Sequence, residues 1–500
     1  MITLAIEAAA LVLLAAVGWL VTPSAHGARW RMAVSLPVGV AVHACVMLVL
    51  LATRLPTARP WAGLLVALAG AAVLAHRRGD VVARRAPGQG RALATAAAIG
   101  VVTLLATAAL PLVNVTADSF RYLTVARLLA LDGDASGMSA FLLQSRSLVT
   151  GAVHGLAASD PSYLRALGPL VAVSTAVSLW LLTREMTSRL GPGLGRWVAG
   201  GAAALLVTNH RFIFNAFYVN GHLLFAAWVL LLVAIAWRRV AGAVVRGDAV
   251  LAVLLATGLT LLRPEGVLVA TVVLLPVVLA PSVAASWRRW VLVGVGAGTV
   301  LWHVGVLAPL TLRDGYSPPF AILGLGLLGL VLVVVAGGLR IADRFVGAWT
   351  LPVAHVGLWA LVLVLAVRDL AILIDSAGAT LRNVLVDGAW GASLLVLAGV
   401  LVVAVLLRRV EHEQVWLFPL LTFVPLSVLL AFLREGAYRV GPGDSLNRML
   451  LHVLPLAVLA VAVTADGEAR PWTRRLASRS SAGDGDEDGR AVLPSAHGLG

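Results

Sequence analysis

Cysteine, lysine and charge are all scarce in this chain of 500 residues, which has one cysteine, no lysine and only 12% charged residues. The single thiol, Cys45, excludes an intramolecular disulfide and a thiolate metal cluster, because each needs a second cysteine. Hydrophobic residues make up 60% of the sequence, which excludes a soluble cytosolic or secreted enzyme. The composition therefore predicts an integral membrane protein.

Apolar stretches of about twenty residues, the length that crosses a bilayer, recur along the whole chain. They predict an all-α polytopic membrane protein with about fifteen transmembrane helices. The predicted spans are residues 4–22, 33–52, 60–76, 92–113, 166–183, 196–208, 217–237, 248–262, 264–283, 290–312, 319–338, 348–367, 389–407, 415–433 and 449–465.

The formal net charge of +14 is carried by arginines in short clusters between apolar segments. Such spacing predicts membrane topology, and it speaks against nucleic acid as a partner. Because cytoplasmic loops are enriched in arginine, we expect the N-terminus outside and the C-terminus in the cytoplasm. The clusters then on the cytoplasmic side include Arg77/Arg78, Arg238/Arg239, Arg288/Arg289 and Arg408/Arg409. Basicity from arginine alone, with abundant alanine, glycine and valine, favours a bacterial plasma membrane.

The predicted organisation has three parts. Residues 1–91 form extra N-terminal transmembrane helices, and residues 92–465 form a transmembrane module with one long outer loop, 114–165. Within this loop we expect interfacial helices, because residues such as Phe120, Leu123 and Ala126 recur at helical spacing. Residues 466–500 are rich in Ser, Gly, Arg and acidic residues, which predicts a disordered cytoplasmic tail.

Asp118 lies where the fourth predicted span leaves the membrane, directly before the first interfacial helix. A carboxylate there can cap the helix, because it accepts hydrogen bonds from free backbone amides and suits the helix dipole. It can also act as a general base towards a hydroxyl whose reaction partner is held in the lipid. One position suits both roles.

Two further polar motifs fall on the predicted outer side. The first, from Arg263 to Gly266, joins two apolar segments with almost no loop, and it is either a tight turn or part of a polar cavity. The second contains Arg439 and Arg448 just before the last span. Arginines at this depth either extend to the membrane surface as anchors or bind a phosphate through paired hydrogen bonds.

A fourth polar group, between residues 209 and 222, includes Arg211, Asn220 and His222 and interrupts two apolar segments. Such a break is tolerated where the backbone lines protein or water, which predicts a cavity wall. No histidine pair has the spacing of a helix-borne zinc site. The sequence therefore predicts no cofactor, and it leaves a divalent metal open without a motif for one.

In order, spacing and common side, the three outer motifs resemble the GT-C class of membrane glycosyltransferases, of the protein-mannosyltransferase and aminoarabinose-transferase-like superfamily. These enzymes take sugars from polyprenyl-phosphate donors at the extracytoplasmic face. The resemblance covers about residues 92 to 465. It includes the last motif, in which Arg448 leads into a span that contains Pro455. It departs from the family pattern in its extra N-terminal helices. A second departure is that Asp132 and Asp134 are too far along the chain to share a proton with Asp118.

The resemblance implies a GT-C-like helical bundle and an inverting transferase without a nucleotide donor. Asp118 would be the catalytic base, and Arg448 with Arg439 would bind the donor phosphate. The cavity around them would include Arg121, Tyr122, Arg263, Glu265, Asn220 and His222. The implied partners are the lipid bilayer, a polyprenyl-phosphate-linked sugar donor and an envelope glycan, lipid or protein acceptor.

Two other functional classes stay open. A transporter or flippase of a lipid-linked intermediate is expected to have charges near mid-bilayer and often repeated halves, and the sequence has neither. A non-catalytic scaffold on a GT-C-like fold would tolerate replacement of Asp118 and Arg448 together. Loss of sugar transfer on replacement of Asp118 alone separates the enzyme from both alternatives.

Overall fold

The structure is a computed structural model, and it describes most of the chain. The described residues are 2–54, 59–80, 89–110, 113, 115–158, 163–317, 320–342, 350–391, 393–395, 397–399, 402, 414–433, 436–441 and 443–483. Within these ranges every regular element is a helix and there is no β-strand. The all-α prediction is therefore confirmed for the described residues.

Ten helical segments of the described chain are long and apolar enough to cross a membrane. They lie within α1 (Ile2–Val21), α2 (Ala28–Ala52), α3 (Pro60–Arg78), α8 (Leu167–Met186), α11 (His222–Val240), α14 (Ala285–Val300) continued through a π-helical stretch into α15 (Ala308–Arg313), α16 (Phe320–Ala342), α17 (Thr350–Arg368), α20 (Gln414–Leu433) and α21 (Ser445–Gly483). The chain is thus a multi-pass membrane protein in architecture.

The other predicted spans have shorter helices. They correspond to α4 (Gln89–Ala109), α9 (Gly191–Val207), α12 (Asp248–Leu262) and α13 (Gly266–Val278). The span predicted at 389–407 falls mostly outside the described residues, so the count of fifteen stays a prediction. Helix α18 (Leu370–Arg382) was not predicted, because its sequence has charges at both ends and too few apolar residues to span a bilayer.

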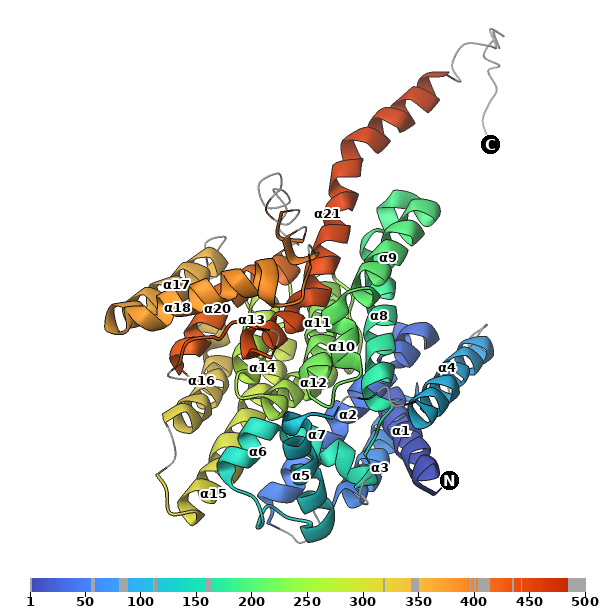
Figure 1. Ribbon diagram of the computed structural model, residues 1–500. Helices are drawn as coiled ribbons and strands as arrows, with labels where there is room; N and C mark the ends of the chain where they lie inside the picture. Colours follow the sequence, from blue (N-terminus) through green and yellow to red (C-terminus); the bar gives the residue numbers. More distant parts are fainter. Residues whose placement is uncertain are drawn as a thin grey trace, which may run out of the picture.

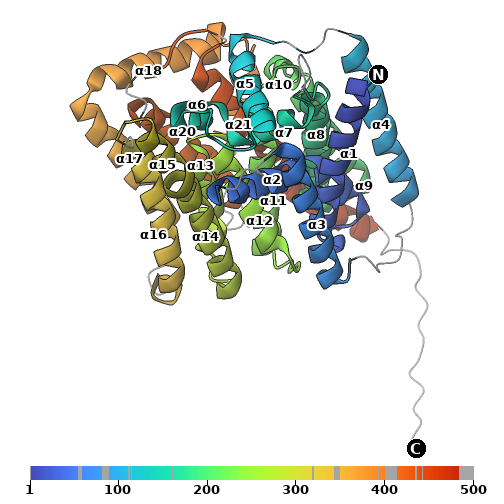
Figure 2. The same cartoon turned by 90° about the horizontal axis from the view of Figure 1, so that it is seen from below.

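Helix α11 forms the centre of the bundle, and its residues from Leu223 to Ala236 are all buried. Helices α2 and α21 are also mostly buried, whereas α17 is mostly exposed. Figures 1 and 2 place α16, α17 and α18 along one side of the bundle and α4 on the opposite side. A helix that is apolar all round is buried in protein or faces lipid, and both kinds occur here.

Pro37 breaks the hydrogen-bond ladder of α2, because proline has no backbone N–H to donate to the Ala33 carbonyl. The Ser174 hydroxyl of α8 donates to that carbonyl instead. The indole of Trp228 on α11 donates to the Pro37 carbonyl at 2.8 Å. The proline thus becomes the point at which three helices are joined by polar contacts within an apolar core.

Helices α1 and α2 approach each other through two glycines. A Cβ atom at Gly18 would lie 1.7 Å from the Ser35 carbonyl oxygen, and one at Gly39 would lie 1.8 Å from the Leu14 carbonyl oxygen. Small residues allow such close backbone contact between helices in a membrane.

We expect Gly39→Ala to destabilise the protein, because the added methyl meets backbone and overpacking costs about 1–3 kcal/mol. Gly70→Ala in α3 is the matched control, since a Cβ there meets no atom within 4 Å and alanine favours a helix by about 1 kcal/mol. Thermal unfolding of the detergent-solubilised variants measures both. Equal melting temperatures for the two variants would contradict the close contact.

The end of the bundle with the predicted cytoplasmic loops is held by ion pairs. Arg78 pairs with Asp80 at 2.9 Å, and Arg238 contacts Glu185 with its Nε at 3.0 Å. Helix α21 continues to Gly483, past the boundary at residue 466 that the sequence predicts for a disordered tail. Residues 484–500 of that predicted tail lie outside the described residues.

The described part of the loop 114–165, which the sequence predicts on the outer side, contains three α-helices, α5 (Ala117–Asp132), α6 (Ala140–Arg146) and α7 (Leu148–His154). Helix α5 is amphipathic as expected, but Phe120 is exposed and its buried face includes Tyr122, Val125 and Leu129. Helix α7 is entirely buried, so it is a core element and not the interfacial helix that its moderate hydrophobicity predicts. Helix α7 packs against both α5 and α2, so it holds α5 against the bundle.

Candidate functional site

Asp118 and Arg448 meet although they are 330 residues apart in the chain. Asp118 lies in the first turn of α5 and Arg448 in the first turn of α21. Nη1 of Arg448 lies 3.0 Å from Oδ2 of Asp118, and both side chains are partly exposed, at 21% and 33%. The two residues with the most specific predicted roles thus form an ion pair that remains accessible.

Arg263 and Glu265 form a second ion pair beside the first. Arg263 is the C-cap of α12 and Glu265 directly precedes α13, so the tight turn brings Nε of Arg263 within 2.8 Å of Oε1 of Glu265. The Arg263 guanidinium also hydrogen-bonds with the Tyr122 side chain of α5. Tyr122 itself is 2% exposed. This second pair therefore links α5 to the turn between α12 and α13.

The motif needs a glycine at position 266, because the backbone of α12 lies very close to it. A Cβ atom at that position would lie 1.8 Å from the Leu259 carbonyl oxygen of α12. Only glycine permits α13 to begin so close to the end of α12. The tight turn predicted from the sequence and the polar cluster are therefore both present, and the turn brings Arg263 and Glu265 of the cluster together.

A pair of histidines extends the cluster towards α21. Nδ1 of His222 lies 2.9 Å from Nε2 of His452, and Nε2 of His222 lies 3.5 Å from Nη1 of Arg263. The His452 ring stacks on Phe225, with 3.8 Å between ring centroids. His452 is one helical turn beyond Arg448 on α21. It therefore connects α11 with the helix that carries Arg448. The sequence gives no sign of this contact, because His452 is a single histidine in an apolar run.

Asn220 positions the start of α11. Its Oδ1 accepts a hydrogen bond from the His222 backbone amide at 2.9 Å, and its Nδ2 donates to Asn215 at 2.9 Å. Nearby, the Thr116 hydroxyl just before α5 donates to the Tyr218 hydroxyl at 3.0 Å. Burial raises the pKa of Tyr218, so this phenol stays neutral as a hydrogen-bonding group. The segment between α10 (His210–Ala216) and α11 thus forms one wall of the site, as the polar break in the sequence predicts.

Arg211 on α10 is a further cation at the site. It is 4% exposed, and its Nε donates to the Gly388 carbonyl. Burial lowers the pKa of Arg211, and the positive charge of Arg448 lowers it further. Nη2 of Arg211 and Nε of Arg448 are buried without a hydrogen-bond partner among the described residues. The sequence suggests Arg211 only as part of a cavity wall, because its distance from Arg448 depends on the fold.

Two of the predicted residues are peripheral. The Arg439 side chain is exposed, and its backbone amide donates to Oδ1 of Asp444 at 3.0 Å. Asp444 also caps α21 by accepting from the Leu446 amide at 2.8 Å. Arg121 on α5 is exposed as well. Arg439 therefore helps to shape the loop before α21 through its backbone, and the structure brings neither of these two side chains into the ion-pair cluster.

One small cleft lies beside the cluster. A cleft of about 20 Å³ is bordered by Tyr218, Asn220, Asn215 and Arg165, which is close to the volume that one water molecule needs. Among the described residues no group of three or more His, Cys, Asp or Glu side chains could hold a metal ion. The cluster has two carboxylates, Asp118 and Glu265, and three arginines, and the described residues around it provide no metal-ligand set.

No protein-family model, curated protein or solved structure matches this chain.

Proposed function

We propose that the protein is an inverting membrane glycosyltransferase of GT-C type, with a GT-C-like helical arrangement. It transfers a sugar from a polyprenyl-phosphate donor to an envelope acceptor at the extracytoplasmic face. One observation carries the proposal: a partly exposed carboxylate, Asp118, lies against Arg448, whose Nε and the neighbouring Nη2 of Arg211 lack partners among the described residues. A base beside unsatisfied cationic donors is what transfer from a lipid phosphate requires.

In this reaction the acceptor hydroxyl attacks the anomeric carbon from the face opposite the phosphate, and Asp118 takes the hydroxyl proton. The bond between the anomeric carbon and the phosphate oxygen breaks, and its electron pair leaves with the lipid phosphate. Arg448 and Arg211 donate hydrogen bonds to the phosphate and stabilise its developing charge. The repulsion between their two positive charges is relieved when the anion binds between them.

The remaining cluster has a positioning role. The pair Arg263–Glu265 fixes the turn on which Tyr122 rests, and Tyr122 is one turn beyond Asp118 on α5. The histidine pair fixes α21 relative to α11. The catalytic base and the phosphate ligands come from three separate helices, so their distances depend on these contacts. The polyprenyl chain of the donor lies in the bilayer, where it supplies affinity without a soluble domain.

The proposal is tested by sugar transfer in membranes that contain the protein, supplied with a panel of polyprenyl-phosphate sugars and crude envelope acceptors. We expect Arg211→Gln to raise the KM for the donor about tenfold or more, because a hydrogen bond to a charged phosphate is lost. Arg196→Gln on α9 is the control, since Arg196 is exposed and takes no part in the cluster. An unchanged KM in Arg211→Gln would remove this arginine from the phosphate site.

A further inference from the structure

Helices α14 and α16 pack against each other through a second pair of glycines. A Cβ atom at Gly296 would lie 2.5 Å from the Gly329 carbonyl oxygen, and one at Gly329 would lie 2.9 Å from the Gly296 carbonyl oxygen. By contrast, a Cβ at Gly337, farther along α16, would meet no atom within 4 Å. The two helices therefore touch at Gly296, and there is open space beside Gly337.

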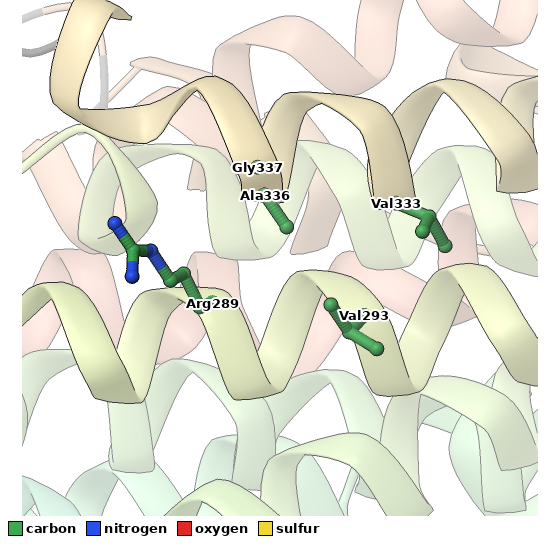
Figure 3. A pocket seen from close by; sticks show the side chains of 5 residues that line it. All are labelled: Arg289, Val293, Val333, Ala336 and Gly337. Atoms are coloured by element: carbon green, nitrogen blue, oxygen red, sulfur yellow. The ribbon is translucent and has the colours of Figure 1, made fainter.

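A groove of about 540 Å³ opens on the outside of the bundle between α14 and α16. Its walls are apolar, with Val293 from α14 and Val333, Ala336 and Gly337 from α16. Arg289 lies at one end, and its guanidinium extends from α14 into the space between the helices (Figure 3). Nε of Arg289 is buried without a hydrogen-bond partner among the described residues.

The charged end of the groove is far from the candidate site along the bundle axis. Helix α12 ends at Arg263 in the site, and α13 leads away from the site to Val278. Nη1 of Arg288 donates to the Val278 carbonyl at 3.1 Å, which holds the start of α14 beside the end of α13. The groove's arginine is thus at the face opposite the site, where the arginine clusters predict the cytoplasm.

The depth of Arg289 in the membrane follows from its neighbour. Trp290 is 70% exposed, and exposed tryptophans on transmembrane helices lie at the level of the lipid headgroups. The Arg288 side chain points inward and donates to the Val278 carbonyl, whereas the Arg289 side chain lines the groove. A cation at headgroup depth above an apolar groove matches the two parts of an anionic phospholipid.

We propose that this groove binds an anionic phospholipid of the cytoplasmic leaflet, with one acyl chain between α14 and α16 and the headgroup phosphate on Arg289. The site is separate from the proposed transferase site and does not depend on it. Charge complementarity selects an anionic lipid over a zwitterionic one, because the second charge of a choline headgroup would meet the same arginine unfavourably.

Native mass spectrometry of the full detergent-solubilised chain, titrated with dioleoyl phosphatidylglycerol or dioleoyl phosphatidylcholine, tests the proposal. We expect tighter binding of phosphatidylglycerol and about tenfold weaker binding in Arg289→Gln, because a charge-assisted hydrogen bond is lost. Gly337→Leu should fill the groove and weaken binding of phosphatidylglycerol while the fold is kept, since the new side chain enters open space.

Two variants serve as matched controls and should bind phosphatidylglycerol as the wild type does. Arg246→Gln removes an exposed arginine outside the groove, and Gly338→Leu adds the same side chain one residue away, where a Cβ also meets nothing within 4 Å. Equal binding of the two lipids, or wild-type binding in Arg289→Gln, would overturn the proposal. A dimer that Gly337→Leu dissociates would overturn it too, because the groove would then hold a second copy of the chain.

Discussion

Asp118→Asn is expected to abolish measurable sugar transfer while donor binding is kept. Loss of a general base lowers the rate about 10²- to 10⁴-fold, and asparagine keeps the size of the side chain and can still accept a hydrogen bond from Arg448. The measurement is transfer from a panel of polyprenyl-phosphate sugars in membranes, with donor retention by the purified variant measured in parallel.

Asp132→Asn is the matched control, because Asp132 is an exposed carboxylate at the other end of the same helix. It should transfer sugar at the wild-type rate. Full transfer by Asp118→Asn would show that this carboxylate is not the base. If the wild type transfers sugar from no donor, the result would instead favour a transporter of lipid-linked intermediates or a non-catalytic scaffold. A scaffold would keep its function when Asp118 and Arg448 are both replaced.

Glu265→Gln is expected to destabilise the protein by about 3–5 kcal/mol, because it leaves Arg263 buried without its carboxylate partner. The two side chains are only 17% and 8% exposed, so water cannot replace the lost charge. Thermal unfolding in detergent should show a large fall in melting temperature. Because Tyr122 rests on Arg263, residual transfer activity should fall as well.

The control for this effect is Glu185→Gln, which removes the carboxylate of another arginine pair at the opposite face of the bundle. Glu185 is 42% exposed, so its loss should cost about 1 kcal/mol or less. The double variant Arg263→Gln/Glu265→Gln should regain part of the stability, since no unpaired buried charge remains. If Glu265→Gln is no less stable than Glu185→Gln, the pair has no structural role.

The position of the arginines in the sequence has consequences for both proposals. Clusters at one face accompany Trp290 and the groove of α14 and α16, while Arg211, Arg263 and Arg448 converge at the other face. The second set is enclosed by helix ends, whereas Arg289 of the first set lines a groove on the outside of the bundle. The two proposals thus give one residue type two kinds of anion recognition, distinguished by what surrounds each guanidinium.

The sequence by itself determined the membrane class and much of the helical frame. Length and apolarity are local properties, so predicted spans such as 33–52, 60–76 and 415–433 correspond closely to α2, α3 and α20. The turn from Arg263 to Gly266 could also be predicted from the sequence, because proline and glycine determine the local backbone conformation. The predicted face of α5 is only partly buried, because Ala126 is buried and Phe120 is exposed, and hydrophobicity does not separate a residue that faces lipid from one that faces protein.

Only the tertiary structure decided which polar residues meet. Asp118 and Arg448 are 330 residues apart, and the pairing of His222 with His452 spans 230 residues, so no spacing rule connects them. Arg211 is part of the site and Arg439 is exposed at its edge, although both lie in predicted outer loops. The physical reason is that a membrane sets the direction of each helix but not its neighbours. Neighbours follow from close contacts such as Gly18 with Ser35 and Gly296 with Gly329, which depend on shape.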